Sequence, residues 1–181
     1  MRSEFGLVLL VAACSGRPPV DDDPPQPAIE IVVINRSTET LTVRNQVSCG
    51  FDPVVVTDAE GNPLRIAAGQ AYSCTETQGD DPCPEVGSCS TVAGRVLEPG
   101  ARWTGSWDGR YVETRQLSAR GSNCPDQCVI RKRVPEQPVV LRAIATACTE
   151  EDCRGGPREL VAETNFEIGG GGAVELEFDD P

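Results

Sequence analysis

The stretch Ala101-Arg-Trp-Thr-Gly-Ser-Trp107 is followed by Asp108-Gly109 and then by Arg110-Tyr-Val-Glu-Thr-Arg-Gln-Leu117. An Asp-Gly pair between two strand-like runs is the strongest short-range signal for a β-hairpin, because both residues tolerate the positive φ angles of a tight turn. We therefore predict that the two runs pair as antiparallel strands around Asp108-Gly109.

Further strand-like segments lie on both sides of this stretch, rich in β-branched residues or alternating apolar and polar positions, with turn residues between them. No window shows a convincing helical period. We predict hairpins from 29–35 with 39–44, from 53–57 with 63–67, and from 159–168 with 173–178 through the loop Gly169-Gly-Gly-Gly172. In the last strand Val174, Leu176 and Phe178 are expected to face the core. The chain is thus predicted to be an all-β, antiparallel β-sandwich of about ten strands.

The segment Leu97-Glu-Pro-Gly-Ala-Arg-Trp-Thr-Gly-Ser-Trp-Asp-Gly109 resembles a pattern in bacterial immunoglobulin-like domains, including intracellular-proteinase-inhibitor-type domains. In that pattern a Pro-Gly turn precedes an aromatic strand and a Trp-Asp-Gly turn. The resemblance implies an immunoglobulin-like β-sandwich. It supports the architecture more than it supports proteinase inhibition.

The N-terminal run Phe5–Ala13 has nine apolar or small residues. This length suits an export signal and is far below the roughly 20 residues of a membrane-spanning helix. Val11-Ala12-Ala13-Cys14 resembles the lipobox of bacterial lipoproteins. The resemblance implies cleavage before Cys14 and attachment of lipid to that residue, and Ser15 in the next position implies the outer membrane of the cell envelope, on its periplasmic or surface face.

The chain is therefore expected to divide into a signal peptide at 1–13, a lipidated cysteine with a Pro/Asp-rich tether at 14–27, and a single domain at 28–181. Residues 15–27 contain five prolines and the run Asp21-Asp22-Asp23. We interpret this run as an extended, solvated spacer that reaches on the order of 40 Å. The basic run Arg131-Lys132-Arg133 is interpreted as a solvated strand face.

A formal net charge of −12 argues against a nucleic-acid partner, because phosphates would be repelled. The expected partners are the membrane, through lipid on Cys14, and an envelope protein or glycan.

Nine cysteines less Cys14 leave an even number, which in an exported protein indicates disulfides. Eight cysteines allow 105 connectivities. We predict local pairs, with a zinc site of Cys124, Cys128, Cys148 and Cys153 as the alternative. The compartment and the absence of histidine favour disulfides over any metal. The predicted pairs are Cys49 with Cys74, Cys83 with Cys89, Cys124 with Cys128, and Cys148 with Cys153.

Trp103, Trp107 and Tyr111 are the candidate binding residues. A period of two places Trp103 and Trp107 on one face, and the predicted hairpin places Tyr111 across from them. Exposed, this ladder would stack on sugar rings or anchor a protein. Only seven aromatic residues follow the signal, so we favour the interpretation that the ladder is buried in the core.

The sequence does not favour an enzyme or a cofactor. It has no histidine, a single lysine, Lys132, and no Gly-x-Ser-x-Gly motif. We predict a non-enzymatic domain with an interaction or structural role. The alternatives are a proteinase inhibitor, a carbohydrate-binding module and, less favoured, a hydrolase that uses two carboxylates.

Overall fold

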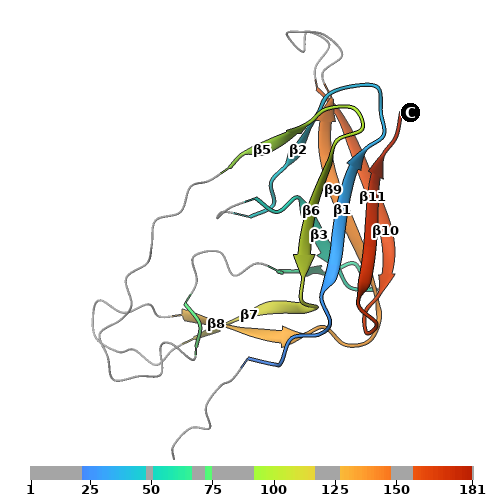
Figure 1. Ribbon diagram of the computed structural model, residues 1–181. Coiled ribbons are helices and arrows are strands. Elements are labelled where there is room, and N and C mark those ends of the chain that lie inside the picture. The colour runs from blue at the N-terminus through green and yellow to red at the C-terminus, as the bar shows by residue number, and fades with distance from the viewer. Residues whose placement is uncertain are drawn as a thin grey trace, which may run out of the picture.

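The computed structural model describes residues 22–47, 51–66, 72–74, 92–116, 127–147 and 157–180 (Figure 1). In these ranges the chain is all-β, with eleven strands and no helix. The strands are β1 (Ile29–Asn35), β2 (Leu41–Arg44), β3 (Val54–Thr57), β4 (Pro63–Leu64), β5 (Gly94–Leu97), β6 (Arg102–Trp107), β7 (Arg110–Gln116), β8 (Gln127–Arg133), β9 (Pro138–Ala147), β10 (Arg158–Glu167) and β11 (Gly172–Phe178).

The first sheet has three strands in the order β11-β1-β6. Strand β1 pairs antiparallel with β6 and parallel with β11, from Ile29 opposite Gly172 to Asn35 opposite Phe178. The prediction of a purely antiparallel fold is therefore wrong at this pair. A parallel pair needs a long connection between its strands, and here nearly the whole chain separates β1 from β11.

The second sheet is built around β9. Strands β9 and β10, with ten residues each, are the longest in this sheet. Strand β10 pairs with β9 over its full length, while β3 and β2 share the other edge of β9. Strand β4 extends the sheet beyond β3, and β5 extends it beyond β2. Alternate residues of β9 are buried, including Val139, Leu141 and Ala143.

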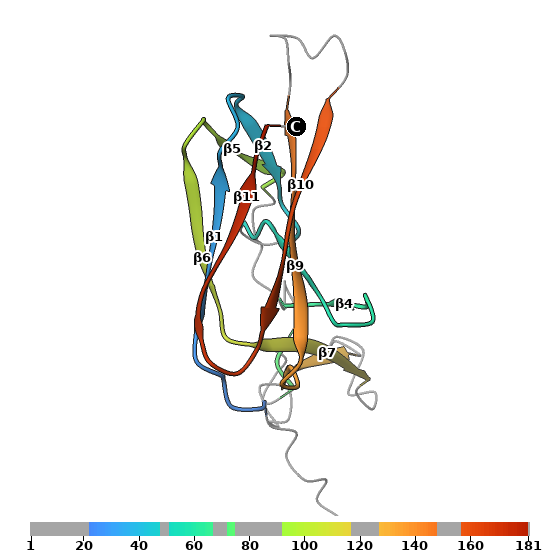
Figure 2. The ribbon, with the colours of Figure 1, turned by 90° about the vertical axis from the view of Figure 1, so that its right-hand side faces the viewer.

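Buried side chains of the two larger sheets form one core cluster, to which Val33 of β1, Leu141 of β9 and Phe178 of β11 belong. Figure 2 shows the strands of these sheets as two layers. In β11, Val174, Leu176 and Phe178 are buried and Glu175 and Glu177 are exposed, as the alternation predicted.

The third sheet is the pair β7–β8, which lies across one end of the two layers (Figures 1 and 2). Its seven residues on each strand pair antiparallel, from Arg110 opposite Arg133 to Gln116 opposite Gln127. A separate small cluster of Cys74, Cys128 and Ile130 is buried beside it.

The predicted hairpin around Asp108-Gly109 is wrong, because β6 pairs with β1 and β7 pairs with β8. The turn is real, and Gly109 adopts a φ of 68°, but its carbonyl groups bond elsewhere. The carbonyl of Asp108 accepts from the backbone N–H of Gln26, and the carbonyl of Gly109 accepts from that of Val134. The indole N–H of Trp107 donates to the carbonyl of Arg110 at 2.8 Å. The turn therefore directs the chain from the first sheet into the third.

The hairpin predicted from 53–57 and 63–67 is confirmed, with Val56 opposite Leu64 and Thr57 opposite Pro63. The hairpin predicted from 29–35 and 39–44 is wrong, because β1 and β2 belong to different sheets. The loop Gly169–Gly172 likewise connects β10 in the second sheet with β11 in the first, so the last predicted hairpin is also wrong.

Asn35 holds the corner where the chain passes from β1 toward β2. Its side-chain N–H groups donate to the carbonyls of Glu39 at 2.8 Å and Leu97 at 2.9 Å. Its oxygen accepts from the backbone N–H and the hydroxyl of Ser37. Asn35 is fully buried, so these bonds satisfy its polar groups and join three segments of the chain.

Candidate functional site

The predicted aromatic ladder is not an exposed platform. Trp107 is buried in the core with 4% exposure, and Trp103 and Tyr111 are partly buried and pack against the same core. The ring of Trp103 lies over Gly105, where a Cβ atom would clash with it, and meets Phe51 edge to face at 6.0 Å. The burial interpretation is thus confirmed for Trp107, and the ladder across a β6–β7 hairpin is wrong.

The described disulfide joins Cys74 to Cys128, a sequence separation of 54 residues. The predicted pairs Cys49–Cys74 and Cys124–Cys128 are therefore wrong, and a zinc site that uses Cys128 is excluded. Cys49, Cys83, Cys89, Cys124, Cys148, Cys153 and the lipidation candidate Cys14 lie outside the described residues. The preference for local pairs failed because β8 brings Cys128 beside a segment that is remote in the sequence.

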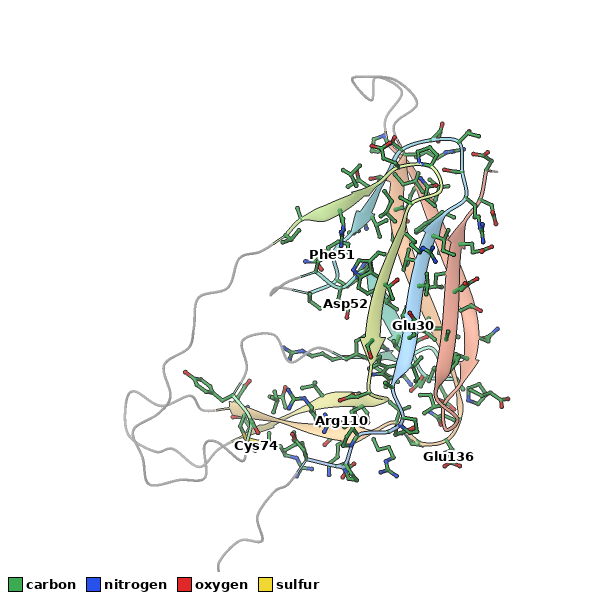
Figure 3. All side chains as sticks on the ribbon, viewed as in Figure 1. Glu30, Phe51, Asp52, Cys74, Arg110 and Glu136 are labelled. Atoms are coloured by element: carbon green, nitrogen blue, oxygen red, sulfur yellow. A yellow bond between two sulfur atoms is a disulfide. The ribbon has the colours of Figure 1, made fainter. Side chains whose placement is uncertain are left out.

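That segment, residues 72–74, covers one half of the outer edge of β8. The carbonyl of Tyr72 accepts from the N–H of Val129 at 2.7 Å, and the N–H of Cys74 donates to the carbonyl of Val129 at 2.9 Å. The disulfide fixes this short parallel bridge in place. Figure 3 shows Cys74 at one end of the β7–β8 hairpin and Arg110 farther along it.

The other half of this edge is covered by residues 22–27, which we name the acidic strap. The carboxylate of Asp22 accepts from the N–H of Arg131 at 2.8 Å, and that of Asp23 accepts from the N–H of Arg133 at 2.9 Å. The N–H of Asp23 donates to the carbonyl of Arg131 at 2.9 Å. Val129, Arg131 and Arg133 alternate along β8, so their backbone N–H groups all point to its outer edge. Each of these three N–H groups is hydrogen-bonded, to Tyr72, Asp22 and Asp23 respectively.

Ion pairs also hold the acidic strap on β8. Asp22 lies 3.2 Å from the guanidinium of Arg131, and Asp23 lies 3.5 Å from the ammonium of Lys132. The guanidinium of Arg110 donates to the carbonyl of Asp23 at 3.0 Å. Farther along, the side-chain amide of Gln26 donates to the carbonyl of Val134 at 2.9 Å.

The interpretation of the aspartate run as a solvated spacer is therefore wrong for Asp22 and Asp23. Arg131 and Lys132 pair with these carboxylates and stay partly exposed to solvent. An uncovered strand edge can pair with another chain. The acidic strap and residues 72–74 together cover the outer edge of β8 from Val129 to Arg133. The sequence signal was present as two runs of opposite charge, but the runs are about a hundred residues apart.

Replacing Asp22 and Asp23 together by alanine is expected to uncover the N–H groups of Arg131 and Arg133. Their hydrogen exchange should become faster by about tenfold, the low end for bonds to charged acceptors, because the strap is partly exposed to solvent. Amide exchange measured by NMR checks this result. The N–H of Val129, which bonds to Tyr72, is the internal control, and Glu163→Ala on an exposed position of β10 is the control variant. Unchanged exchange at Arg131 and Arg133 would show that the carboxylates of Asp22 and Asp23 do not protect these N–H groups.

The acidic strap is also expected to respond to pH. The hydrogen bond from the N–H of Arg133 is the main reason why the pKa of Asp23 is lower than its ordinary value of 3.8, and Lys132 adds to the effect. A lowered pKa in the folded state means that the stabilising contribution is complete above about pH 4 and is lost as the pH falls through the lowered pKa. In an NMR titration, the N–H signal of Arg133 should therefore shift with a midpoint below that of a free aspartate, and Asp23→Asn should abolish the shift. A midpoint at the ordinary value would show that the bond does not form.

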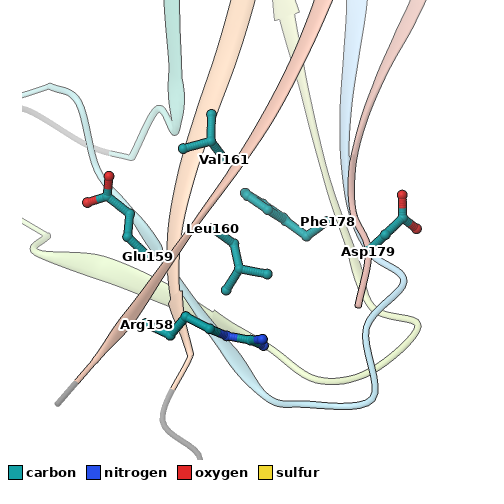
Figure 4. Close-up of a pocket in the computed structure, with 6 residues that line it drawn as sticks. All are labelled: Arg158, Glu159, Leu160, Val161, Phe178 and Asp179. Carbon is teal, nitrogen blue, oxygen red and sulfur yellow. The ribbon is translucent and has the colours of Figure 1, made fainter. Parts of the chain in front are cut away.

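A pocket of about 220 Å³ lies between β10 and β11 (Figure 4). Leu160, Val161 and Phe178 form its apolar part, and Arg158, Glu159 and Asp179 complete the lining. A hydrolase with two carboxylates needs them to converge on one bond. In Figure 4 the carboxylates of Glu159 and Asp179 point to opposite sides, and Glu159 pairs with Arg44 at 3.1 Å. This pocket therefore offers no such pair.

Asp52 is a described carboxyl group whose pKa is raised, and burial is the cause. Its oxygen accepts from the N–H of Val54 at 3.1 Å, a bond that favours the charged form and opposes the effect of burial. This contact lies at the first residue of β3, where the carboxylate closes a turn. The carboxylate of Asp52 therefore has a structural role at the start of β3.

Within the described ranges, no three His, Cys, Asp or Glu side chains gather in a way that could hold a metal ion. The same part of the chain contains no helix with the length and apolarity needed to cross a membrane. Comparisons with protein-family models, with curated proteins and with solved structures find no significant match to this chain.

Proposed function

We propose that this protein is a lipid-anchored lipoprotein of the bacterial cell envelope, attached through Cys14 and displaying a non-enzymatic domain for an interaction or structural role. The observation that carries the proposal is the set of hydrogen bonds from β8 to the carboxylates of Asp22 and Asp23 in the acidic strap. Strand β8 is held by the strap on one half of its edge and by the Cys74–Cys128 disulfide on the other. Because residues 22–27 follow Cys14 closely in the sequence, these bonds join the segment after the proposed anchor to the displayed domain.

The displayed domain is proposed to be an immunoglobulin-like β-sandwich. The proposal is supported by the shared core of the two larger sheets and by the connections that pass between them. The chain changes sheet between β1 and β2, between β5 and β6, and between β10 and β11. Such crossings between two layers are typical of Greek-key sandwiches.

Export from the cytoplasm is supported by the buried disulfide. Disulfides form and persist in oxidising compartments, of which the bacterial periplasm is one. Together with the apolar run before Cys14, this favours the envelope, with the outer membrane as the proposed site.

A protein partner is favoured over a glycan. A carbohydrate platform needs exposed aromatic faces, whereas Trp107 is buried and Trp103 packs on Phe51. Proteinase inhibition rests on the sequence resemblance, and no described contact adds to it.

The experiment is fractionation of bacteria that produce the full chain or its Cys14→Ser variant. The full chain is expected in the membrane fraction and the variant in the soluble fraction, because two or more acyl chains hold a protein stably on a bilayer. Asp22→Ala/Asp23→Ala is the control, since it alters the strap and should leave the membrane fraction unchanged. Membrane association of the Cys14→Ser variant equal to that of the full chain would overturn the proposal.

A further inference from the structure

The described strands separate charge strongly for a protein whose formal net charge is −12. Strands β7 and β8 carry five cationic side chains and one glutamate, a net charge of +4. Strands β10 and β11 carry one arginine and five glutamates, a net charge of −4. The cationic side chains are Arg110, Arg115, Arg131, Lys132 and Arg133.

The acidic strap neutralises part of this cationic hairpin but does not cover it. Asp22 and Asp23 pair with Arg131 and Lys132, and both partners keep contact with solvent, at 43% and 29% side-chain exposure. Arg115, at 53%, lies beyond the reach of the strap contacts and pairs with Glu113 on its own strand. Asp108 pairs with Arg110 beside β7, so with all three aspartates counted the hairpin retains a net charge of +1.

The strap also places the N-terminal end of the described chain. Asp22 sits on the β7–β8 hairpin, at the end of the molecule opposite the C-terminus (Figure 1). Asp22 follows Cys14 by eight positions in the sequence, and a fully extended chain over that separation spans at most about 29 Å. A lipid on Cys14 would therefore keep this end of the molecule within about 29 Å of the bilayer, a distance from which the hairpin can reach its surface.

We propose that the β7–β8 hairpin is the membrane-facing end of the protein and that its cationic side chains contact anionic lipid headgroups. This inference rests on the proposed lipid anchor at Cys14. Free in solution, a molecule with a net charge of −12 is repelled by an anionic surface. Held beside the surface, it is governed by the charges within about one Debye length, roughly 10 Å at 0.1 M salt, and these are the cations of the hairpin. The acidic C-terminal residues Asp179 and Asp180 then lie at the far end.

The test uses the full lipidated protein in vesicles of phosphatidylethanolamine and phosphatidylglycerol with an energy acceptor on the headgroups. A donor fluorophore is attached through azidophenylalanine at Gln116, on the exposed end of β7, or at Asp180, beyond β11. We expect greater energy transfer from position 116 than from position 180. Equal transfer from the two positions, or greater transfer from position 180, would overturn the inference.

Two charge-reversal variants test whether the cations hold the hairpin at the surface. Arg115→Glu/Arg133→Glu changes the charge of the hairpin, and Arg95→Glu/Arg142→Glu makes the same change on exposed positions of β5 and β9. The first variant should lose much of the transfer difference between positions 116 and 180, and the second should keep it. An equal loss in both variants would show that the hairpin has no special role.

The outcome also distinguishes this inference from the proposed anchor. If the protein does not float with the vesicles at all, the lipid anchor and the orientation both fail. If it floats and shows no difference between the two positions, the anchor stands and the orientation is wrong.

Discussion

Removal of the Cys74–Cys128 disulfide by the double substitution Cys74→Ala/Cys128→Ala is expected to lower the free energy of unfolding by about 4 kcal/mol. The bond closes a loop with a sequence separation of 54 residues. In the chain-entropy model, opening a loop of this size gives the unfolded chain roughly that much additional freedom. Equilibrium unfolding in urea measures the loss.

The same experiment tests the cause of the loss. A cross-link that acts on the unfolded state limits the surface exposed on unfolding, so the dependence of the free energy on urea should become steeper when the bond is removed. The control is Val112→Ala, which shortens a buried side chain of β7 and leaves the disulfide intact. A loss below about 1 kcal/mol in the double variant, with unchanged urea dependence, would contradict the expected role of this bond.

Replacement of Asn35 by alanine is expected to lower the free energy of unfolding by about 3 kcal/mol or more, since each buried polar group left without a partner costs roughly 1–3 kcal/mol. The substitution removes the donors to the carbonyls of Glu39 and Leu97 and the acceptor for Ser37. All of these groups lie at the corner between the two larger sheets. Unfolding in urea or by heat measures the effect.

Ser37→Ala is the matched control for this corner. It removes the hydroxyl that donates to Asn35 but leaves the two bonds from the amide of Asn35 to Glu39 and Leu97. Its cost should be about 1 kcal/mol. Equal losses in the two variants would mean that the amide of Asn35 does not hold the corner.

The sequence predicts the strands of this protein much better than their partners. Alternation identifies the buried face of β11, and β-branched runs identify β1, β3 and β9, because both signals depend on a residue and its near neighbours. Asp108-Gly109 predicts a turn for the same reason, and a turn exists there. Which strands then pair depends on contacts from elsewhere in the chain, such as those of Gln26 with the carbonyls of Asp108, Gly109 and Val134.

The candidate site was missed for a related reason. Asp21–Asp23 and Arg131–Arg133 are both conspicuous in the sequence, and each alone indicates a solvated segment. Their pairing becomes visible when the turn at Asp108-Gly109 has placed β7 and β8 across the end of the two layers. The Cys74–Cys128 bond is hidden in the same way among many connectivities. Burial of Trp107 was predictable because a chain with few aromatic residues needs them in its core.

The most direct test of the proposed anchor and of the disulfides is the intact mass of the native protein extracted from bacterial membranes. We expect a chain that begins at Cys14, carries the mass of a diacylglycerol and an acyl group, and contains no thiol that an alkylating reagent can modify before reduction. A chain that retains residues 1–13 without added lipid, or one with two or more free thiols, would contradict this expectation.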